Sequence, residues 1–288
     1  MAPGFSSGPW LAQAPQASAT AASRGKLLLR VIGVDFTSAP RRAKPIVVAE
    51  ALVLRAEVRI ANIVKLESFS AFDTLLRRPG PWIGGFDFPF GLPRDLVRDL
   101  GWPKQWRELA AFCGDLTRIE FRGILDGYRA TRPAGGKYAH RLTDLPAGSS
   151  SPMKLVNPPV ALMFQEGAPR LADAGVYVPG LADGDRSRIA LEAYPGLLAR
   201  RLIGNVSYKN DSKAKQTAAR KQARMKIIAR LPVKADKGIL LRLLDDPTGD
   251  SLDAAICAVQ AAWGWRRRRR NFGLPDRIES CEGWIVSA

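Results

Sequence analysis

Three short apolar segments of this chain each end in an acidic residue, and this arrangement constrains the fold more than any other feature. LLLRVIGVD ends in Asp35, WIGGFD ends in Asp87, and RIALE ends in Glu192. Apolar runs of this length are typical of buried strands. Because open α/β sheets bind ligands at the carboxyl ends of their strands, we predict an α/β fold with acidic side chains along one edge of the sheet.

Further patterns predict the elements around that sheet. Residues 46–66 are rich in β-branched side chains and predict two strands joined by a turn near 55–57. The last predicted helix, residues 251–263, is apolar on nearly all sides and must pack against the sheet. The other predicted elements are strands at 27–35, 82–88 and 188–193, helices at 70–78, 105–116, 119–128, 196–203 and 211–231, and an exposed loop at 130–152.

Length and composition bound the domain organisation. The chain has 288 residues, of which 46% are hydrophobic, enough for one large α/β domain or two small ones. Residues 1–24 are rich in Ala, Ser, Pro and Gln and predict a disordered leader that lacks the features of a signal peptide. We expect one folded domain over residues 25–288, with a helix and loop insertion at about 95–185.

The histidine and cysteine content excludes several kinds of site. His140 is the only histidine, so the chain cannot build an HExxH zinc helix or a Cys2His2 finger. Cys113, Cys257 and Cys281 are far apart and form no CxxC pair. Such sparse cysteines are typical of the reducing cytoplasm, and no apolar run approaches the roughly 18 residues of a membrane span. We therefore expect a cytoplasmic protein without a membrane partner.

Two more acidic residues, Asp250 and Asp253, lie at the start of the last predicted helix, and their spacing places both on one face of it. Buried carboxylates that converge repel one another and need a cation, and oxygen ligands favour Mg²⁺ or Mn²⁺. Together with Asp35, Asp87 and Glu192 they predict a site for one divalent ion, or for two ions roughly 4 Å apart.

Each of these acidic residues also has a purely structural interpretation. Asp35 and Asp87 are each followed by a turn, which their side chains could stabilise. Asp250 could be the N-cap of the last helix, and a carboxylate at Asp253 would favour the helix dipole. Glu192 is equally compatible with a ligand and with a structural hydrogen-bond acceptor.

The net charge of +17 is concentrated near the carboxyl-terminal third of the chain. Residues 200–242 contain 13 basic and two acidic residues, and Arg266–Arg270 are five consecutive arginines. Such clusters attract polyanions through phosphate neutralisation and counterion release. DNA or RNA is therefore a candidate partner, and a solvated helix face is the alternative interpretation.

Several motifs resemble the family called domain of unknown function 429. They are GVDFT, GGFDFPFGLP, LEAYP, GDSLDAAICAVQAAW, and the Tyr208–Lys209 pair with its basic helix. The resemblance covers roughly residues 28–288 apart from about 95–185, and FDFP and DSLDA are its most specific parts. Members are described as predicted nucleases with an RNase H-like fold. This implies a mixed five-stranded sheet flanked by helices, with the helical insertion between the fourth and fifth strands.

The resemblance also implies roles for individual residues. Asp35 and Asp87 match the acids of the first and fourth strands, and Asp253 matches the acid of the closing helix that completes the metal site. Asp250 matches an extra carboxylate of resolvase-like members, and Glu192 matches a Glu-x-Tyr-Pro segment without an assigned role. The implied activity is Mg²⁺- or Mn²⁺-dependent hydrolysis of phosphodiester bonds. The basic side chains expected along the phosphate track are Lys209, Lys213, Lys215, Arg220, Lys221 and Arg224, with Arg266–Arg270 as a possible extension.

The sequence is also compatible with two other functions. A non-catalytic nucleic-acid-binding protein would keep the basic surface, and its acidic residues would not meet around a metal. A phosphotransferase of the actin and sugar-kinase type is suggested by GVDFT, but it needs a second duplicated domain and a phosphate loop. The segment Gly135-Gly136-Lys137 lacks the spacing of such a loop.

Overall fold

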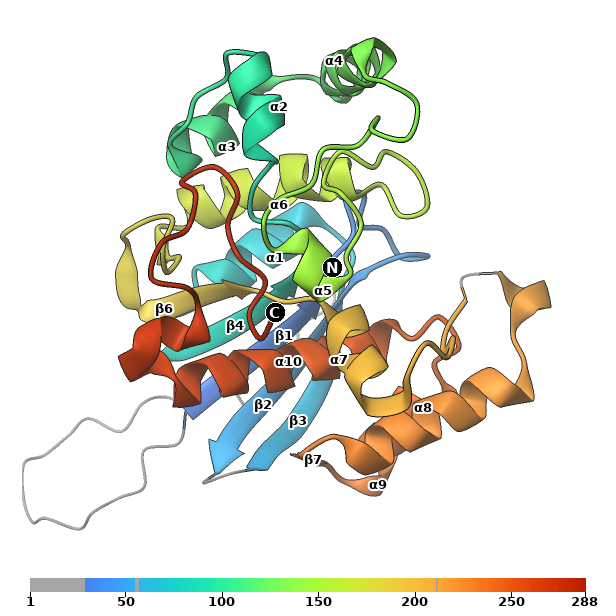
Figure 1. The fold of residues 1–288 in the computed structure, drawn as a ribbon. Helices are drawn as coiled ribbons and strands as arrows, with labels where there is room; N and C mark the ends of the chain where they lie inside the picture. The colour runs from blue at the N-terminus through green and yellow to red at the C-terminus, as the bar shows by residue number, and fades with distance from the viewer. Residues whose placement is uncertain (1–28, 55–56, 211) are drawn as a thin grey trace, which may run out of the picture.

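The computed structural model describes residues 29–54, 57–210 and 212–288 (Figure 1), so the predicted leader lies outside the described residues. Its centre is a mixed sheet of seven strands in the order β5-β6-β4-β1-β2-β3-β7. The strands are β1 (Leu29–Asp35), β2 (Ile46–Leu54), β3 (Glu57–Leu66), β4 (Trp82–Asp87), β5 (Val176–Tyr177), β6 (Asp185–Glu192) and β7 (Val233–Lys234).

Strand β1 lies in the middle of the sheet and separates its antiparallel half from its parallel half. It pairs antiparallel with β2, which pairs antiparallel with β3, whereas β1, β4 and β6 run parallel. In the β1–β4 register, Asp35 is the partner of Asp87 and Gly33 is the partner of Gly85. Parallel strands end at the same edge, so these two aspartates are neighbours at the carboxyl edge of the sheet.

The sheet has seven strands, not the five that the family resemblance implied. The two additional strands, β5 and β7, each pair over only two residues, at opposite edges of the sheet. Strand β7 pairs with a distant part of the chain, as the 3.1 Å hydrogen bond from the Val58 N–H to the Pro232 carbonyl shows, whereas β5 pairs with the nearby β6. A two-residue strand has no alternating pattern, so the sequence could not reveal it.

The helices are α1 (Phe69–Leu76), α2 (Arg94–Asp99), α3 (Trp106–Asp115), α4 (Arg118–Thr131), α5 (Asp144–Ala147), α6 (Val160–Asp173), α7 (Pro195–Ile203), α8 (Ala218–Arg230), α9 (Lys237–Asp245) and α10 (Asp250–Arg266), with 3-10 turns η1 (Lys213–Lys215) and η2 (Arg268–Gly273). Within the described ranges, no helix is long and apolar enough to cross a membrane.

Successive side chains of the sheet alternate between two hydrophobic cores, one on each face. Ile32 and Val34 point into a core completed by α1 and by helices α2, α3, α4 and α6. Val31 and Ile83 point into a core completed by α7, α8, α9 and α10. Figure 1 shows α10 crossing the second face. Its sides are almost all buried, as the apolar pattern of residues 251–263 predicted.

Several helices differ in extent from the sequence-based prediction. The basic helix expected at 211–231 begins only at Ala218, because the Thr217 hydroxyl caps it by accepting a 3.3 Å hydrogen bond from the Arg220 N–H. Helix α9 was not predicted, although Asp236 caps it in the same way through the Ile239 N–H. The loop predicted at 130–152 contains the single helical turn α5.

Candidate metal centre

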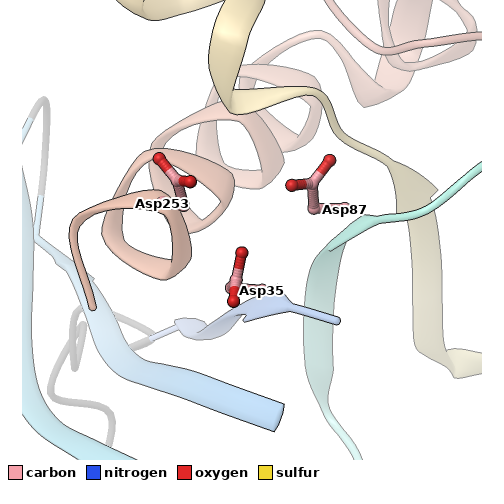
Figure 2. Close-up of side chains that lie close together, drawn as sticks. All are labelled: Asp35, Asp87 and Asp253. Atoms are coloured by element: carbon pink, nitrogen blue, oxygen red, sulfur yellow. The ribbon is translucent and has the colours of Figure 1, made fainter. Parts of the chain in front are cut away.

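Three carboxylates converge at the carboxyl edge of the sheet, as Figure 2 shows. Asp35 is the last residue of β1, Asp87 is the last residue of β4, and Asp253 lies in the first turn of α10. One oxygen atom of each side chain lies within 4.8 Å of one oxygen atom of each of the others. We call these three residues the carboxylate cluster.

Glycines in β1 and β4 allow α10 to approach the sheet closely enough to complete the cluster. A Cβ atom on Gly33 would lie 2.0 Å from the Ala254 carbonyl oxygen and 2.2 Å from the Ala258 nitrogen. A Cβ atom on Gly85 would lie 2.3 Å from the Cys257 carbonyl oxygen. The helix backbone therefore contacts the strand backbone directly, and the first turn of α10 reaches the strand ends.

Burial changes the acidity of the cluster. Asp253 has no exposed surface, and Asp35 is 8% exposed. Burial, reinforced by the negative charges of Asp250, Asp253 and Asp87, raises the pKa of Asp35 well above its usual value. Burial also raises the pKa of Asp253, and it raises the pKa of Asp87 to about 7. Three like charges held this close favour either protons or a cation.

Two residues of the loop after α7 hold Asp253 in place. The Tyr208 hydroxyl donates a 2.6 Å hydrogen bond to Asp253 Oδ1, and Lys209 Nζ forms an ion pair with Asp253 Oδ2. The Lys209 side chain is 42% exposed, so part of it reaches solvent. Burial opposes the charge of Lys209, but the nearby carboxylates prevail and raise its pKa. This lysine is the cation that the fold itself supplies to the cluster.

Asp250 lies beside the carboxylate cluster but belongs to a separate ion pair. Lys44 Nζ, from the segment between β1 and β2, lies 3.1 Å and 3.0 Å from the two Asp250 carboxylate oxygens. The sequence suggested Asp250 as a possible N-cap of α10, but the N-cap in the structure is Gly249, which has a φ of 79°. Asp250 does not join the group of oxygens that Asp35, Asp87 and Asp253 bring together, although its charge contributes to the raised pKa of Asp35.

Glu192, at the end of β6, is part of a different buried network. Arg141 donates to both Glu192 oxygens, at 2.8 Å and 2.7 Å, and also pairs with Asp144 at 2.9 Å. The Phe90 N–H donates to Glu192 Oε2 at 2.9 Å. We call Arg141, Asp144 and Glu192 the arginine network. Its arginine belongs to the long segment between β4 and β6, and no sequence motif marked it.

The predicted basic track is divided between several environments. Lys209 lies at the cluster, Lys215 is exposed, and Lys221 pairs with Asp245 at 2.6 Å. The Arg220 guanidinium bonds to the Ser207 hydroxyl at 3.1 Å. Arg224 has to be removed from the track, because it is 4% exposed and donates to the carbonyls of Leu244 and Tyr208. The side chain of Lys213 lies outside the described part of the chain.

A pocket of about 300 Å³ lies directly against the carboxylate cluster. Asp87, Lys209 and Asp253 form one of its walls, and residues of the long segment between β4 and β6 form another. Through Asp87 and Asp253 the cluster therefore faces a space large enough for a ligand, and Arg141 and Glu192 of the arginine network line the same space.

Fold and site together define an α/β protein with a buried carboxylate cluster at the carboxyl edge of a mixed sheet. The family model described as "Protein of unknown function (DUF429)" matches residues 33–276, so the chain belongs to this family. The match includes all three cluster residues and the long segment between β4 and β6. No curated protein and no solved structure matches the chain.

Proposed function

We propose that this protein is a metal-dependent nuclease that hydrolyses phosphodiester bonds in DNA or RNA at the carboxylate cluster. The observation that carries the proposal is the convergence of Asp35, Asp87 and Asp253 beside a pocket. Hard oxygen donors from three carboxylates suit Mg²⁺ or Mn²⁺. Oxygens around one Mg²⁺ lie about 3–4 Å apart, so small side-chain rotations would bring the cluster oxygens to ligand spacing.

The strand order supports an RNase H-like interpretation of the fold. The five longer strands follow the order β6-β4-β1-β2-β3, with β2 antiparallel to both of its neighbours. The acids lie on the first and fourth strands and on the long helix that packs across the sheet. These are the positions that the family resemblance implied. The three buried free cysteines fit the reducing cytoplasm that we expected for such an enzyme.

The residues at this site have different roles in the proposed reaction. When bound, the divalent ion would supply a deprotonated water at neutral pH and stabilise charge on the phosphate oxygens. Asp35, Asp87 and Asp253 would hold it, and Tyr208 fixes the orientation of Asp253. The ammonium group of Lys209 would neutralise the negative charge of a phosphate that approaches the cluster.

One observation favours a second function, a nucleic-acid-binding protein without catalysis. The ion pair between Lys209 and Asp253 already gives the cluster an internal cation. If that ion pair persists, phosphates would bind to the basic side chains, and no divalent ion would enter. The two functions differ in a measurable property, which is the affinity of the cluster for Mn²⁺.

A cleavage panel tests the proposal. Labelled single strand, duplex, RNA–DNA hybrid and four-way junction would be incubated with Mg²⁺ or Mn²⁺ at a stated salt concentration. We expect metal-dependent cutting of at least one substrate, and its loss in the Asp35→Asn and Asp253→Asn variants. The matched control is Asp183→Asn, which changes an aspartate that is 87% exposed in its side chain.

The outcomes separate the candidate functions. Cutting that persists in both cluster variants would reject this site. Nucleic-acid binding without Mn²⁺ binding or cutting would establish the second function. Absence of cutting, metal binding and nucleic-acid binding would overturn both.

A further inference from the structure

The pocket beside the carboxylate cluster has walls from distant parts of the chain. One wall is the cluster itself, with Asp87 and Asp253. Another part of the lining comes from the long segment between β4 and β6, through Val160 and Met163 of α6. Tyr194, at the start of α7, is a third contributor. A ligand in this pocket would contact the cluster at one end and apolar side chains along its body.

The position of α6 relative to the cluster is set by close packing. A Cβ atom on Gly167 of α6 would lie 2.6 Å from the ring of Phe88, the residue that follows Asp87. Phe88 is buried, and its ring packs at a tilt against those of Phe36, at a centroid distance of 4.7 Å, and Phe90, at 5.3 Å. The apolar wall is therefore held at a defined distance from the strand end that carries Asp87.

The chemistry of the lining favours a largely apolar group with some polar edges. Apart from the cluster, the charged residues in the wall are Lys209 and the ion-paired residues Arg141 and Glu192. The hydroxyl groups of Ser149 and Tyr208 supply polar contacts. A volume of about 300 Å³ is at the lower end for ligand pockets and suits one nucleotide, not a base pair.

The geometry points to a pocket that takes the base and sugar of one unpaired nucleotide in a nucleic-acid strand, with its phosphate at the carboxylate cluster. This inference rests on the proposed function and deepens it by naming the substrate class. Apolar and aromatic walls bind nucleobases by stacking, and a base must leave its duplex to enter such a pocket. The protein therefore selects single-stranded or extruded nucleotides, and Met163 is a specificity-determining residue.

Binding of paired oligonucleotides tests the base contribution without relying on cleavage. A thymidine oligonucleotide and a fully abasic one of the same length carry the same charge, so only the bases differ. We expect wild-type protein in Ca²⁺ to bind the abasic strand about tenfold more weakly, the value of one stacked base. Fluorescence anisotropy gives both dissociation constants. Equal affinities would overturn the inference.

A second experiment fills the pocket with a larger side chain. Met163→Trp should weaken binding of the thymidine strand about tenfold and leave the abasic strand unchanged, because the added ring occupies the space of the base. Met225→Trp is the matched control, since Met225 is 53% exposed on α8 and does not line this pocket. A Met163→Trp protein that binds both strands as wild type does would contradict the inference. The wild-type comparison stands even if this variant does not fold.

The two binding experiments, combined with the cleavage panel, also distinguish this inference from the proposed function. Base-dependent binding without metal-dependent cutting would support the pocket and reject the nuclease. Cutting with no difference between thymidine and abasic strands would support the nuclease and reject the pocket. Free thymidine monophosphate that binds as tightly as the strand would overturn the assignment to strands in favour of free nucleotides.

Discussion

Two buried groups of acidic residues lie at the same edge of the sheet, and they differ in what neutralises them. In the arginine network, a fully buried guanidinium binds both Glu192 and Asp144 with several hydrogen bonds. In the carboxylate cluster, Lys209 forms an ion pair with Asp253. Burial raises the pKa of Glu192 even though Arg141 opposes the shift, and it raises the pKa of Asp87 to about 7.

This difference shows that a position at the end of a strand does not decide the role of an acidic residue. Glu192 and Asp87 each end one of the neighbouring parallel strands β6 and β4, but Glu192 is in register with Phe86 and not with Asp87. Glu192 is paired with a buried arginine, and Asp87 lies among the other carboxylates of the cluster.

The largest effect is expected from Arg141→Met. This change leaves Glu192 and Asp144 buried without their cation, which should lower the free energy of unfolding by about 3–5 kcal/mol. Urea denaturation measures it. Lys209→Met is the comparison at the carboxylate cluster, and its cost should be smaller because the lysine is partly exposed and the cluster acids can take up protons. Equal costs would contradict the contrast.

The next effect concerns the metal. Mn²⁺ at about 100 times its dissociation constant should raise the free energy of unfolding by about 2.7 kcal/mol, because it binds only the folded protein. Asp35→Asn should abolish this increment, and Glu192→Gln should retain it, since Glu192 lies in the arginine network. Thermal unfolding with and without Mn²⁺ gives the result. Loss of the increment in Glu192→Gln would show that the two groups are not independent.

A smaller effect is expected when α10 is lifted from the sheet. Gly33→Ala places a methyl group against the α10 backbone and should cost about 1–3 kcal/mol of stability through overpacking. It should also weaken Mn²⁺ binding, because Asp253 moves away from the strand ends. Gly123→Ala is the control, since its Cβ atom would meet nothing within 4 Å in α4. That variant should be neutral or slightly stabilised, and equal destabilisation would argue against close packing as the cause.

The remaining effect is a pH dependence, which is small for each pH unit. The folded pKa of Asp87 is raised from 3.8 to about 7, so the folded state keeps a proton that the unfolded chain releases. Its contribution to stability is complete below pH 3.8 and is lost as the pH rises through 7. In chelator, the free energy of unfolding should therefore fall between these values, by at most about 1.4 kcal/mol per pH unit for this group.

Urea denaturation at several pH values measures this slope. Asp87→Asn should flatten it, and saturating Mn²⁺ should reverse it, because the ion competes with protons for the carboxylates. A slope that Asp87→Asn leaves unchanged would assign the titration to other groups.

Sequence patterns predicted the parts of the fold that depend on local properties. The five longer strands, the apolar helix α10 and the positions of Asp35 and Asp87 at strand ends follow from the run and spacing of apolar side chains. The short edge strands β5 and β7 and the late start of α8 were not predicted. Strand β7 depends on pairing with a distant segment, β5 is only two residues long, and the start of α8 depends on one capping side chain.

The candidate site, like the fold, could be predicted only in part from the sequence. The sequence indicated all five acids, but it could not divide them into a cluster of three, an ion pair of Asp250 with Lys44, and an arginine network around Glu192. The sequence pattern of α8 does not separate Arg224 from exposed basic residues such as Lys221. In the structure, however, the Arg224 guanidinium is buried against the carbonyls of Tyr208 and Leu244. Helical periodicity alone does not distinguish these environments.

The ends of the main strands, and the acidic residues at those ends, can be predicted from the sequence because both are properties of neighbouring residues. Which acids pair with a buried cation becomes apparent only when distant segments are brought together in the fold. Arg141 lies 51 positions from Glu192, and Lys44 lies 206 positions from Asp250. The charge balance of a buried carboxylate depends on groups within a few ångströms in space, and no local pattern records those neighbours.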